Sequence, residues 1–408
     1  MQTNLLKNIL ETPQGQEANN ILRACVHCGF CTATCPTYQI LGDELDSPRG
    51  RIYLIKQVLE GEPVTNKTRS HLDRCLTCRS CETTCPSGVK YGRLIDIGRE
   101  IVEAKTSRNL IEKTTRYALR KIIPYPERFK FLLNIGAKFK PLLPEALKDK
   151  IPEIQTAGSW PKLKHKRKML VLAGCAQQTV SPQTNVATAN VLSALGIDLI
   201  QQPEVKCCGA VSQHLSATDE TLSTIKHNID LWWHHVNNGI EAIIITASGC
   251  GVMVKDYAHL LAHDEYYALK AKRVSELAKD ISEIIAAEDF SQKSLPKINT
   301  SVSFHSPCTL QHGLQLNGVV EKILTDIGYH LEQVDDAHLC CGSAGTYSIL
   351  QPVLSKQLLS NKISALQKNR PDIIATANIG CQMHLSTQSE QPVKHWIELL
   401  ETAICPSK

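Results

Sequence analysis

The sequence predicts an α plus α/β fold, in which an α-helical domain precedes two tandem α/β modules, and three observations support this prediction. A four-cysteine run near the start of the chain recurs 50 residues later, with helical sequence between the copies. A different set of four cysteines, further along the chain, recurs at a spacing of 133 residues for three of its members and 131 for the fourth. Around each copy of that set, short apolar runs alternate with helical patterns, which is typical of a parallel sheet covered by helices.

The four-cysteine run has one form in both copies. Cys25–Thr37 reads CVHCGFCTATCPT and Cys75–Ser87 reads CLTCRSCETTCPS, so both follow C-x2-C-x2-C-x3-C-P. In two-cluster bacterial ferredoxins, such a run gives three thiolates to one [4Fe–4S] cluster and the fourth to the other. The spacing therefore predicts two [4Fe–4S] clusters. The first takes Cys25, Cys28, Cys31 and Cys85, and the second takes Cys75, Cys78, Cys81 and Cys35.

Zinc and disulfides are the alternatives for this chain of 17 cysteines. Structural zinc is commonly held by two well-separated C-x2-C pairs, which the duplicated run fits poorly. We recognise neither a secretory signal nor a transmembrane stretch, since the most apolar run, Ala242–Val254, is too short. We therefore expect a reducing compartment, where many cysteines indicate metal or redox chemistry rather than a disulfide framework.

The segment between the two runs reads as helical. Ser47–Gly61 offers a serine N-cap, a proline at the first helical position and a glycine stop, and Thr65–Cys75 reads as a second, short helix. Helices between the cysteine loops favour an α-helical ferredoxin domain. The nearby arginines could compensate anionic clusters or be solvated surface charges, and they are Arg49, Arg51, Arg74 and Arg79.

The second repeat centres on two adjacent cysteine pairs that each precede a glycine. The first copy holds Cys175, Cys207, Cys208 and Cys250, and the second holds Cys308, Cys340, Cys341 and Cys381. We expect each copy to place its cysteines at strand ends or at the CCG turn, so that four sulfurs converge on one sheet edge. Gly209 and Gly342 would allow close backbone approach, and the helix that begins there would offer N–H groups. The alternative is that these cysteines are small buried hydrophobic residues.

The expected strands and helices repeat with the cysteines. The strands of the first copy lie in Lys168–Cys175, Gly196–Pro203 and Glu241–Cys250, with helices around 185–195 and 225–236. The second copy has strands in 298–308, 329–334 and 371–381 and a helix over 352–368. We thus expect a ferredoxin domain over 1–104, a basic helical linker over 105–165, and CCG modules over 166–290 and 291–408.

These motifs resemble those of a known family. CVHCGFCTATCPTYQ, SPRGRIYLIKQ and SPCTLQHG, ahead of and within tandem CCG modules, are similar to the iron–sulfur subunits of bacterial glycolate oxidase. Related subunits occur in anaerobic glycerol-3-phosphate dehydrogenase, lactate-utilisation complexes and heterodisulfide reductase. The resemblance covers nearly the whole chain.

The resemblance implies an electron-transfer subunit of an oxidoreductase complex. A FAD-containing partner would oxidise glycolate to glyoxylate, and also D-lactate, because we find no flavin or NAD motif and no catalytic residue on this chain. The electrons would pass to a membrane quinone or another acceptor, with the subunit peripheral to the cytoplasmic face of the inner membrane. Two rival functions are electron transfer in glycerol-3-phosphate or lactate oxidation, and a scaffold whose clusters only hold the fold together.

The chain departs from the heterodisulfide reductase pattern at the end of each CCG module. There, Met253 and His384 occupy the position of a closing cysteine. Histidine can ligate iron, but a thioether replaces a thiolate poorly, so a five-thiolate cluster is in doubt. What remains is a further Fe–S cluster on four cysteines, or a degenerate site.

Residues 105–168 are strongly basic, with 17 Lys and Arg against 5 Asp and Glu. The alternation of apolar clusters and lysines over 128–147 suits an anionic membrane surface or an acidic partner. The alternative is a solvated helical linker. Nucleic acid is an unlikely partner on sequence grounds, because no recognition motif accompanies the charge. We interpret His234 and His235 as surface residues of an amphipathic helix and His305 and His312 as strand-end packing. We expect no role for Cys405.

Overall fold

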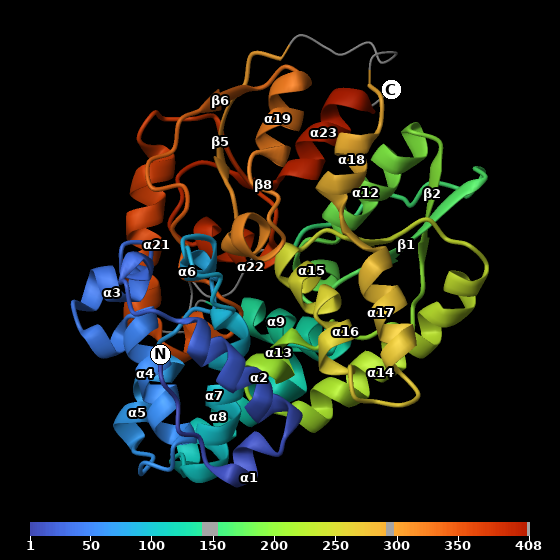
Figure 1. Ribbon diagram of the computed structural model, residues 1–408. Helices are drawn as coiled ribbons and strands as arrows, with labels where there is room; N and C mark the ends of the chain where they lie inside the picture. The colour runs from blue at the N-terminus through green and yellow to red at the C-terminus, as the bar shows by residue number, and fades with distance from the viewer. Residues whose placement is uncertain (141–153, 291–297, 406–408) are drawn as a thin grey trace. The chain divides into compact units, whose positions relative to one another are not determined.

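The computed structural model describes residues 1–140, 154–290 and 298–405, and the chain forms two compact units. The smaller unit consists of Met1–Arg116 together with Asp336–Lys362. The larger unit consists of Tyr117–Asp335 and Ile363–Lys408. Figure 1 labels their helices and strands.

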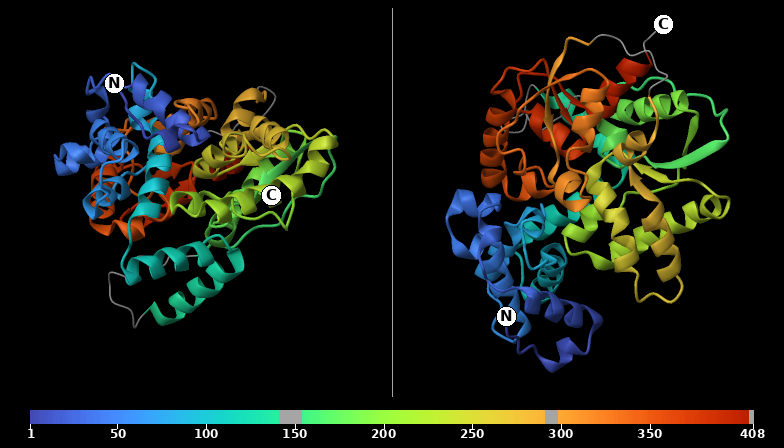
Figure 2. Two further views of the ribbon diagram at one scale, coloured as in Figure 1. Left: turned by 60° about the horizontal axis from the view of Figure 1, so that its bottom comes forward. Right: turned by 45° about the horizontal axis from the view of Figure 1, so that its top comes forward.

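The first part of the smaller unit is made of short helices joined by loops, as the blue segments of Figure 2 show. Its helices are α1 (Lys7–Leu10), α2 (Pro13–Ala24), η1 (Phe30–Thr32), α3 (Pro36–Leu41), η2 (Glu44–Asp46), α4 (Pro48–Leu59), α5 (Asn66–Asp73), α6 (Ser80–Thr83) and α7 (Tyr91–Lys105). The core between α2, α4 and α7 contains Leu22, Ile55 and Leu94, all fully buried. Burying a side chain of this kind stabilises the fold by about 1.5–3 kcal/mol.

The two helices expected between the cysteine runs are confirmed. Ser47 caps α4 by accepting a hydrogen bond of 3.0 Å from the Gly50 N–H, and a proline opens the helix. Thr65 caps α5 in the same way, through the Thr68 N–H. The α4 helix packs closely on α7 at Gly98. A Cβ at this position would lie 2.6 Å from the Ile55 side chain, so the contact requires glycine.

The smaller unit also contains a segment from the distant part of the chain. Asp336–Lys362 carries α20 (Tyr347–Leu350) and the start of α21 (Pro352–Gln367). The Tyr347 hydroxyl donates a hydrogen bond of 3.1 Å to the Arg74 carbonyl, which joins this segment to the end of α5. The sequence did not indicate this exchange, and the domain boundaries proposed above remain a prediction.

The larger unit holds two parallel sheets with the same strand order, which confirms the expected tandem α/β modules. The first sheet has the order β2-β1-β3-β4, and its strands are β1 (Arg167–Leu172), β2 (Ile197–Gln201), β3 (Ile243–Ile245) and β4 (Ala278–Asp280). The second has the order β6-β5-β7-β8, and its strands are β5 (Ser301–His305), β6 (His330–Glu332), β7 (Ile373–Thr376) and β8 (Val393–His395). Each central strand is buried, as the apolar runs suggested.

Helices cover the sheets of the larger unit (Figure 1). They are α9 (Pro126–Phe139), α11 (Gln177–Val180), α12 (Pro182–Ala194), α13 (Ala210–His214), α14 (Thr218–Asn237), α15 (Ser248–Lys255), α16 (Tyr257–Leu260), α17 (Ala268–Leu277), α18 (Ile281–Ala287), η4 (Thr309–Gly313), α19 (Val319–Asp326), α22 (Ile379–Ser386) and α23 (Trp396–Ile404). A core that includes Val171, Phe304 and Trp396 joins residues of both sheets. Of the basic segment, α8 (Leu110–Ile122) and α9 are helical as expected, and residues 141–147 lie outside the described part.

The first and third strands of both modules end before the cysteines expected at their ends, and the first strands stop at Leu172 and His305. The third strand of each module stops at Ile245 and at Thr376, and the cysteines that follow lie in helices. Cys250 lies in the first turn of α15 and Cys381 in the first turn of α22. Among the described residues, no helix combines the length and apolar character needed to cross a bilayer.

Candidate metal centres

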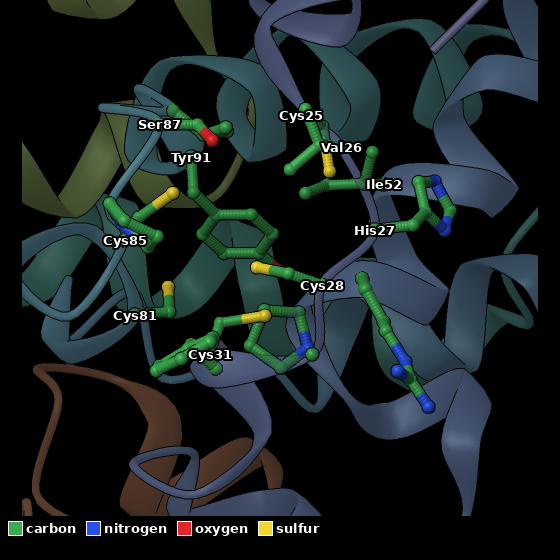
Figure 3. A pocket seen from close by; sticks show the side chains of 16 residues that line it. Cys25, Val26, His27, Cys28, Cys31, Ile52, Cys81, Cys85, Ser87 and Tyr91 are labelled. Carbon is green, nitrogen blue, oxygen red and sulfur yellow. The ribbon is translucent and has the colours of Figure 1, made fainter.

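Four of the predicted ligands surround one cavity of about 420 Å³ in the smaller unit. Its walls include three cysteines of the first run and the last cysteine of the second: Cys25, Cys28, Cys31 and Cys85. Figure 3 shows their sulfurs around the ring of Tyr91. This is the crossed combination that the ferredoxin spacing predicts.

A second cavity, of about 300 Å³, has the complementary set of cysteines on its walls. These are Cys35, Cys75, Cys78 and Cys81. Cys81 and Tyr91 line both cavities, so the two sites are direct neighbours. The walls of each cavity include three cysteines of one run and the last cysteine of the other, which is the pattern of two [4Fe–4S] clusters rather than that of structural zinc.

The backbone of the two cysteine loops repeats as faithfully as the sequence. His27 and Gly29 in the first loop have φ angles of 56° and 87°, and Thr77 and Arg79, 50 positions later, have 53° and 61°. Three of these four residues are not glycine, and each such position costs about 1–3 kcal/mol. Alternation of left- and right-handed residues turns successive N–H groups towards one side, which is how proteins cradle anions and Fe–S clusters. The Thr77 N–H lies 3.4 Å from Cys75 Sγ.

The crowded thiols of these sites are difficult to ionise without a cation. Burial, and then the neighbouring Cys25, raise the pKa of Cys31 to about 11. Burial, followed by Cys78 and Cys75, raises the pKa of Cys81 well above its usual value. A bound metal reverses this preference, because it requires thiolates and displaces their protons. The donor set and the cradle of N–H groups therefore both fit an anionic Fe–S cluster.

The first CCG module brings its four cysteines into one row in the larger unit. Cys175 Sγ donates to Cys207 Sγ at 3.3 Å, and Cys208 contacts both Cys207 and Cys250. Hydrogen bonds from Cys175, Cys208 and the N–H groups of Gly209 and Val211 lower the pKa of Cys207. Gly209, with φ of 96°, caps α13 as expected for close approach at the CCG turn. The sulfurs of this module thus converge at the CCG turn.

Met253 packs beside this row instead of a fifth cysteine. It is buried, and its methyl carbon would lie 3.4 Å from a Cβ at Gly209. The position therefore offers a thioether close to the CCG turn, and a thioether is a weak ligand.

The cysteines of the second CCG module are divided between the two units. Cys340 and Cys341 belong to the smaller unit, where the Gly342 N–H lies 3.4 Å from Cys340 Sγ. A Cβ at Gly342 would lie 2.7 Å from the Ser355 carbonyl, so this turn requires glycine. Cys308 and Cys381 belong to the larger unit.

His305, which the sequence suggests is strand-end packing, lies buried close to a cysteine of the second CCG module. A ring nitrogen of this buried histidine lies within 4.8 Å of Cys381 Sγ, and its Nδ1 is 3.0 Å from the Thr376 hydroxyl. In the sequence, His305 immediately precedes the Ser-Pro-Cys turn at Cys308. His234, in contrast, lies exposed on α14 as expected.

Known proteins share both the domains and the full length of this chain. The 4Fe-4S dicluster domain family matches residues 21–89, and the cysteine-rich CCG domain family matches residues 169–255 and 302–386. The glycolate oxidase iron–sulfur subunit of Escherichia coli is 54% identical over 405 residues, which cover 99% of each chain. The chain belongs to the family of glycolate oxidase iron–sulfur subunits.

More distant relatives agree with this assignment. The probable glycolate oxidase iron–sulfur subunit of Bacillus subtilis is 31% identical, over 90% of this chain and 89% of that protein. A crystal structure of a hypothetical protein from Helicobacter pylori matches with a TM-score of 0.58, covering 98% of this chain and 75% of that one. At 10% identity, that likeness concerns the fold alone. As a member of this family, the chain is an iron–sulfur subunit of an oxidoreductase.

Proposed function

We propose that this subunit relays electrons from a flavin-containing subunit that oxidises glycolate to a membrane quinone or another acceptor. The observation that carries the proposal is a pair of adjacent cavities. Cys25, Cys28, Cys31 and Cys85 line the first, Cys35, Cys75 and Cys78 line the second, and Cys81 and Tyr91 line both. Bound Fe–S clusters would supply one-electron transfer, which suits a chain without a flavin motif. Neighbouring sites allow successive transfers between them.

The residues of the chain would hold and shield the clusters. We propose Cys25, Cys28, Cys31 and Cys85 as ligands of the first, and Cys75, Cys78, Cys81 and Cys35 as ligands of the second. The left-handed residues of the loops direct N–H groups towards the sulfurs, and the buried Tyr91 closes the space between the cavities. The CCG cysteines are proposed as sites of additional Fe–S clusters.

Membrane association is proposed from α9. Phe131, Ile135 and Phe139 follow at intervals of four residues and are 65%, 37% and 55% exposed, whereas Phe129 and Leu133 pack inward against Val180. Exposed lysines, Lys130 and Lys138, accompany the apolar stripe. This combination suits an anionic lipid surface, into which the aromatic rings would insert while the lysines meet the headgroups.

The electron-relay function is tested with the Cys75→Ser variant in complex with the flavin subunit. We expect glycolate to reduce the clusters of the unaltered complex, followed by EPR, and to support dye reduction. In Cys75→Ser, the second cluster should be missing and glycolate-dependent dye reduction should be lost. Cys405→Ser, at a cysteine outside every site, is the control. Clusters that glycolate never reduces would favour the scaffold function, and reduction by lactate or glycerol 3-phosphate instead would assign the relay to another substrate.

A further inference from the structure

The two cysteine-lined cavities differ in the arginine that accompanies each of them. Arg49 and Arg51 lie two positions apart on α4, and Arg49 lines the first cavity while Arg51 lines the second. Arg51 is 1% exposed, and the Arg49 side chain is 36% exposed. A charge in solvent is screened, whereas a charge buried among protein atoms acts strongly on its neighbours.

Arg51 is fixed by hydrogen bonds on every side of its guanidinium. Its Nε donates to the His71 carbonyl at 2.8 Å, and one terminal nitrogen donates to the Thr37 hydroxyl at 3.1 Å. The same nitrogen lies 4.0 Å from Cys35 Sγ, and the other donates to Asp46 Oδ1 at 3.1 Å. The cation therefore contacts a proposed cluster ligand directly.

Asp46 completes a buried network that retains net positive charge. Its carboxylate is fully buried and also accepts from Arg74 at 2.9 Å, with His71 Nδ1 at 3.2 Å. Two arginines thus share one carboxylate. Arginine keeps its proton inside proteins, so Arg51 stays a cation beside Cys35 although it is buried.

Arg49 is arranged differently. It pairs with Glu44, with 2.5 Å between Nε and Oε1, and this single carboxylate balances its charge in a half-exposed position. No comparable buried cation lines the first cavity among the described residues.

We infer that Arg51 tunes the second cluster site, so that a cluster held by Cys35, Cys75, Cys78 and Cys81 has a higher reduction potential than it would have without this buried cation. Adding an electron to a thiolate-bound cluster makes it more negative, and a nearby cation stabilises that state. Asp46 positions the guanidinium and moderates its effect. This inference rests on the proposed ligand sets.

The test is an anaerobic EPR redox titration of the full-length chain and its variants, after iron quantitation. The signal of the second site is identified as the one lost in Cys75→Ser; if no signal is lost, the ligand assignment fails rather than the tuning. In Arg51→Gln we expect the ratio of reduced to oxidised second cluster, at a fixed potential, to fall at least tenfold, which is about 59 mV for one electron. The first cluster should not respond.

Two further variants test the sign of the charge effect and its dependence on burial. Asp46→Asn removes a buried negative charge and should shift the second potential upward, opposite to Arg51→Gln. Arg49→Gln, the matched control, should shift neither potential by as much. If Arg51→Gln assembles no second cluster, Asp46→Asn provides the test: a higher potential of the second cluster in this variant supports the inference, and an unchanged potential contradicts it. An unchanged potential in Arg51→Gln, or a shift of the same sign in both buried variants, would overturn the inference.

Discussion

The Tyr91 hydroxyl donates a hydrogen bond to Cys75 Sγ, with 3.5 Å between oxygen and sulfur. The ring of the same tyrosine lines both cysteine-lined cavities, and it is almost completely buried. Burial, followed by the charge of Cys75, raises the pKa of this phenol well above its usual value, so it remains a donor.

Tyr91→Phe should lower the reduction potential of the second cluster by removing that donor. Hydrogen bonds to ligand sulfurs stabilise the reduced, more negative state of a cluster. The loss should be smaller than that in Arg51→Gln, because a neutral donor is removed rather than a charge. Redox titration followed by EPR measures it, and Tyr347→Phe, whose hydroxyl binds the Arg74 carbonyl, is the control. An unchanged potential in Tyr91→Phe would contradict the proposed role of the bond.

The crossed ligand sets predict which cluster each cysteine variant loses. Cys85 lies in the second run, yet Cys85→Ser should disrupt the first cluster and leave the second signal intact. Two [4Fe–4S] clusters contain about eight irons, and the variant should retain about four of them. Iron quantitation with EPR checks this. Loss of the second signal instead, the one sensitive to Cys75→Ser, would show that each run holds its own cluster.

The row of sulfurs in the first CCG module predicts a metal site beyond the ferredoxin clusters. Metal analysis of anaerobically prepared protein should then exceed about eight irons per chain. Cys207→Ser should remove the excess and spare both ferredoxin signals, since Cys207 contacts Cys175 and Cys208. Met253→Leu, a buried change of similar volume, should retain it. If the unaltered protein carries no excess metal, these cysteines are packing residues.

The exposed stripe of α9 predicts binding to anionic vesicles. Replacing Phe131 and Phe139 by serine should weaken co-sedimentation with vesicles containing phosphatidylglycerol at least tenfold, because two aromatic rings no longer insert. Leu269→Ser, at a position 83% exposed on α17, is the matched control. An equal loss of vesicle binding in the double variant and in Leu269→Ser would contradict a specific role of α9. Equal binding of the unaltered chain to neutral vesicles would contradict recognition of anionic lipid.

The buried His395 predicts lower stability in acid. Burial lowers its pKa to about 4, and its ring is neutral, because Nδ1 accepts from the Ile397 N–H and Nε2 faces the Thr246 carbonyl at 2.8 Å. The unfolded chain takes up a proton below pH 6.5 while the folded chain does not. Stability therefore falls from pH 6.5 down to about 4, by about 3 kcal/mol in total.

Urea denaturation at about pH 7 and pH 5.5 measures the effect of His395. The side chain in His395→Asn can still cap the helix but cannot titrate. The loss of unfolding free energy between pH 7 and pH 5.5 should therefore be smaller in this variant than in the unaltered chain, by about 1 kcal/mol. His263→Asn, at an exposed position, should behave like the unaltered chain. The same pH dependence in all three proteins would exclude His395 as the cause.

Local signals in the sequence were enough to predict the helices between the cysteine runs and the presence of the strands, whereas the crossed cysteine sets remain a prediction with which the lining of the two cavities agrees. Ser47 and Pro48 predict the start of α4, because a capping residue acts on the N–H groups of the next few residues. The duplicated cysteine spacing likewise predicts two sites, and two cysteine-lined cavities are present. The ends of β3 and β7 were placed too late, because the helix that follows each strand begins only three residues after the strand ends.

Long-range relationships were beyond the sequence. The burial that separates Arg51 from Arg49 depends on Asp46 and His71, which approach only in the folded unit. In the same way, nothing near His305 in the sequence says that Cys381 lies within reach of its ring. Pattern and composition cannot report such encounters, because they record neighbours along the chain rather than in space.

The joining of Tyr347 to Arg74, residues 273 positions apart, has a consequence for biosynthesis. The amino-terminal portion leaves the ribosome first, but it lacks the Asp336–Lys362 strip until most of the polypeptide has been translated. Closing so long a loop is entropically costly and slow compared with local contacts. Residues 1–116 therefore cannot complete their fold until residues 336–362 have been synthesised. We expect chains truncated before residue 336 to leave this unit incompletely folded.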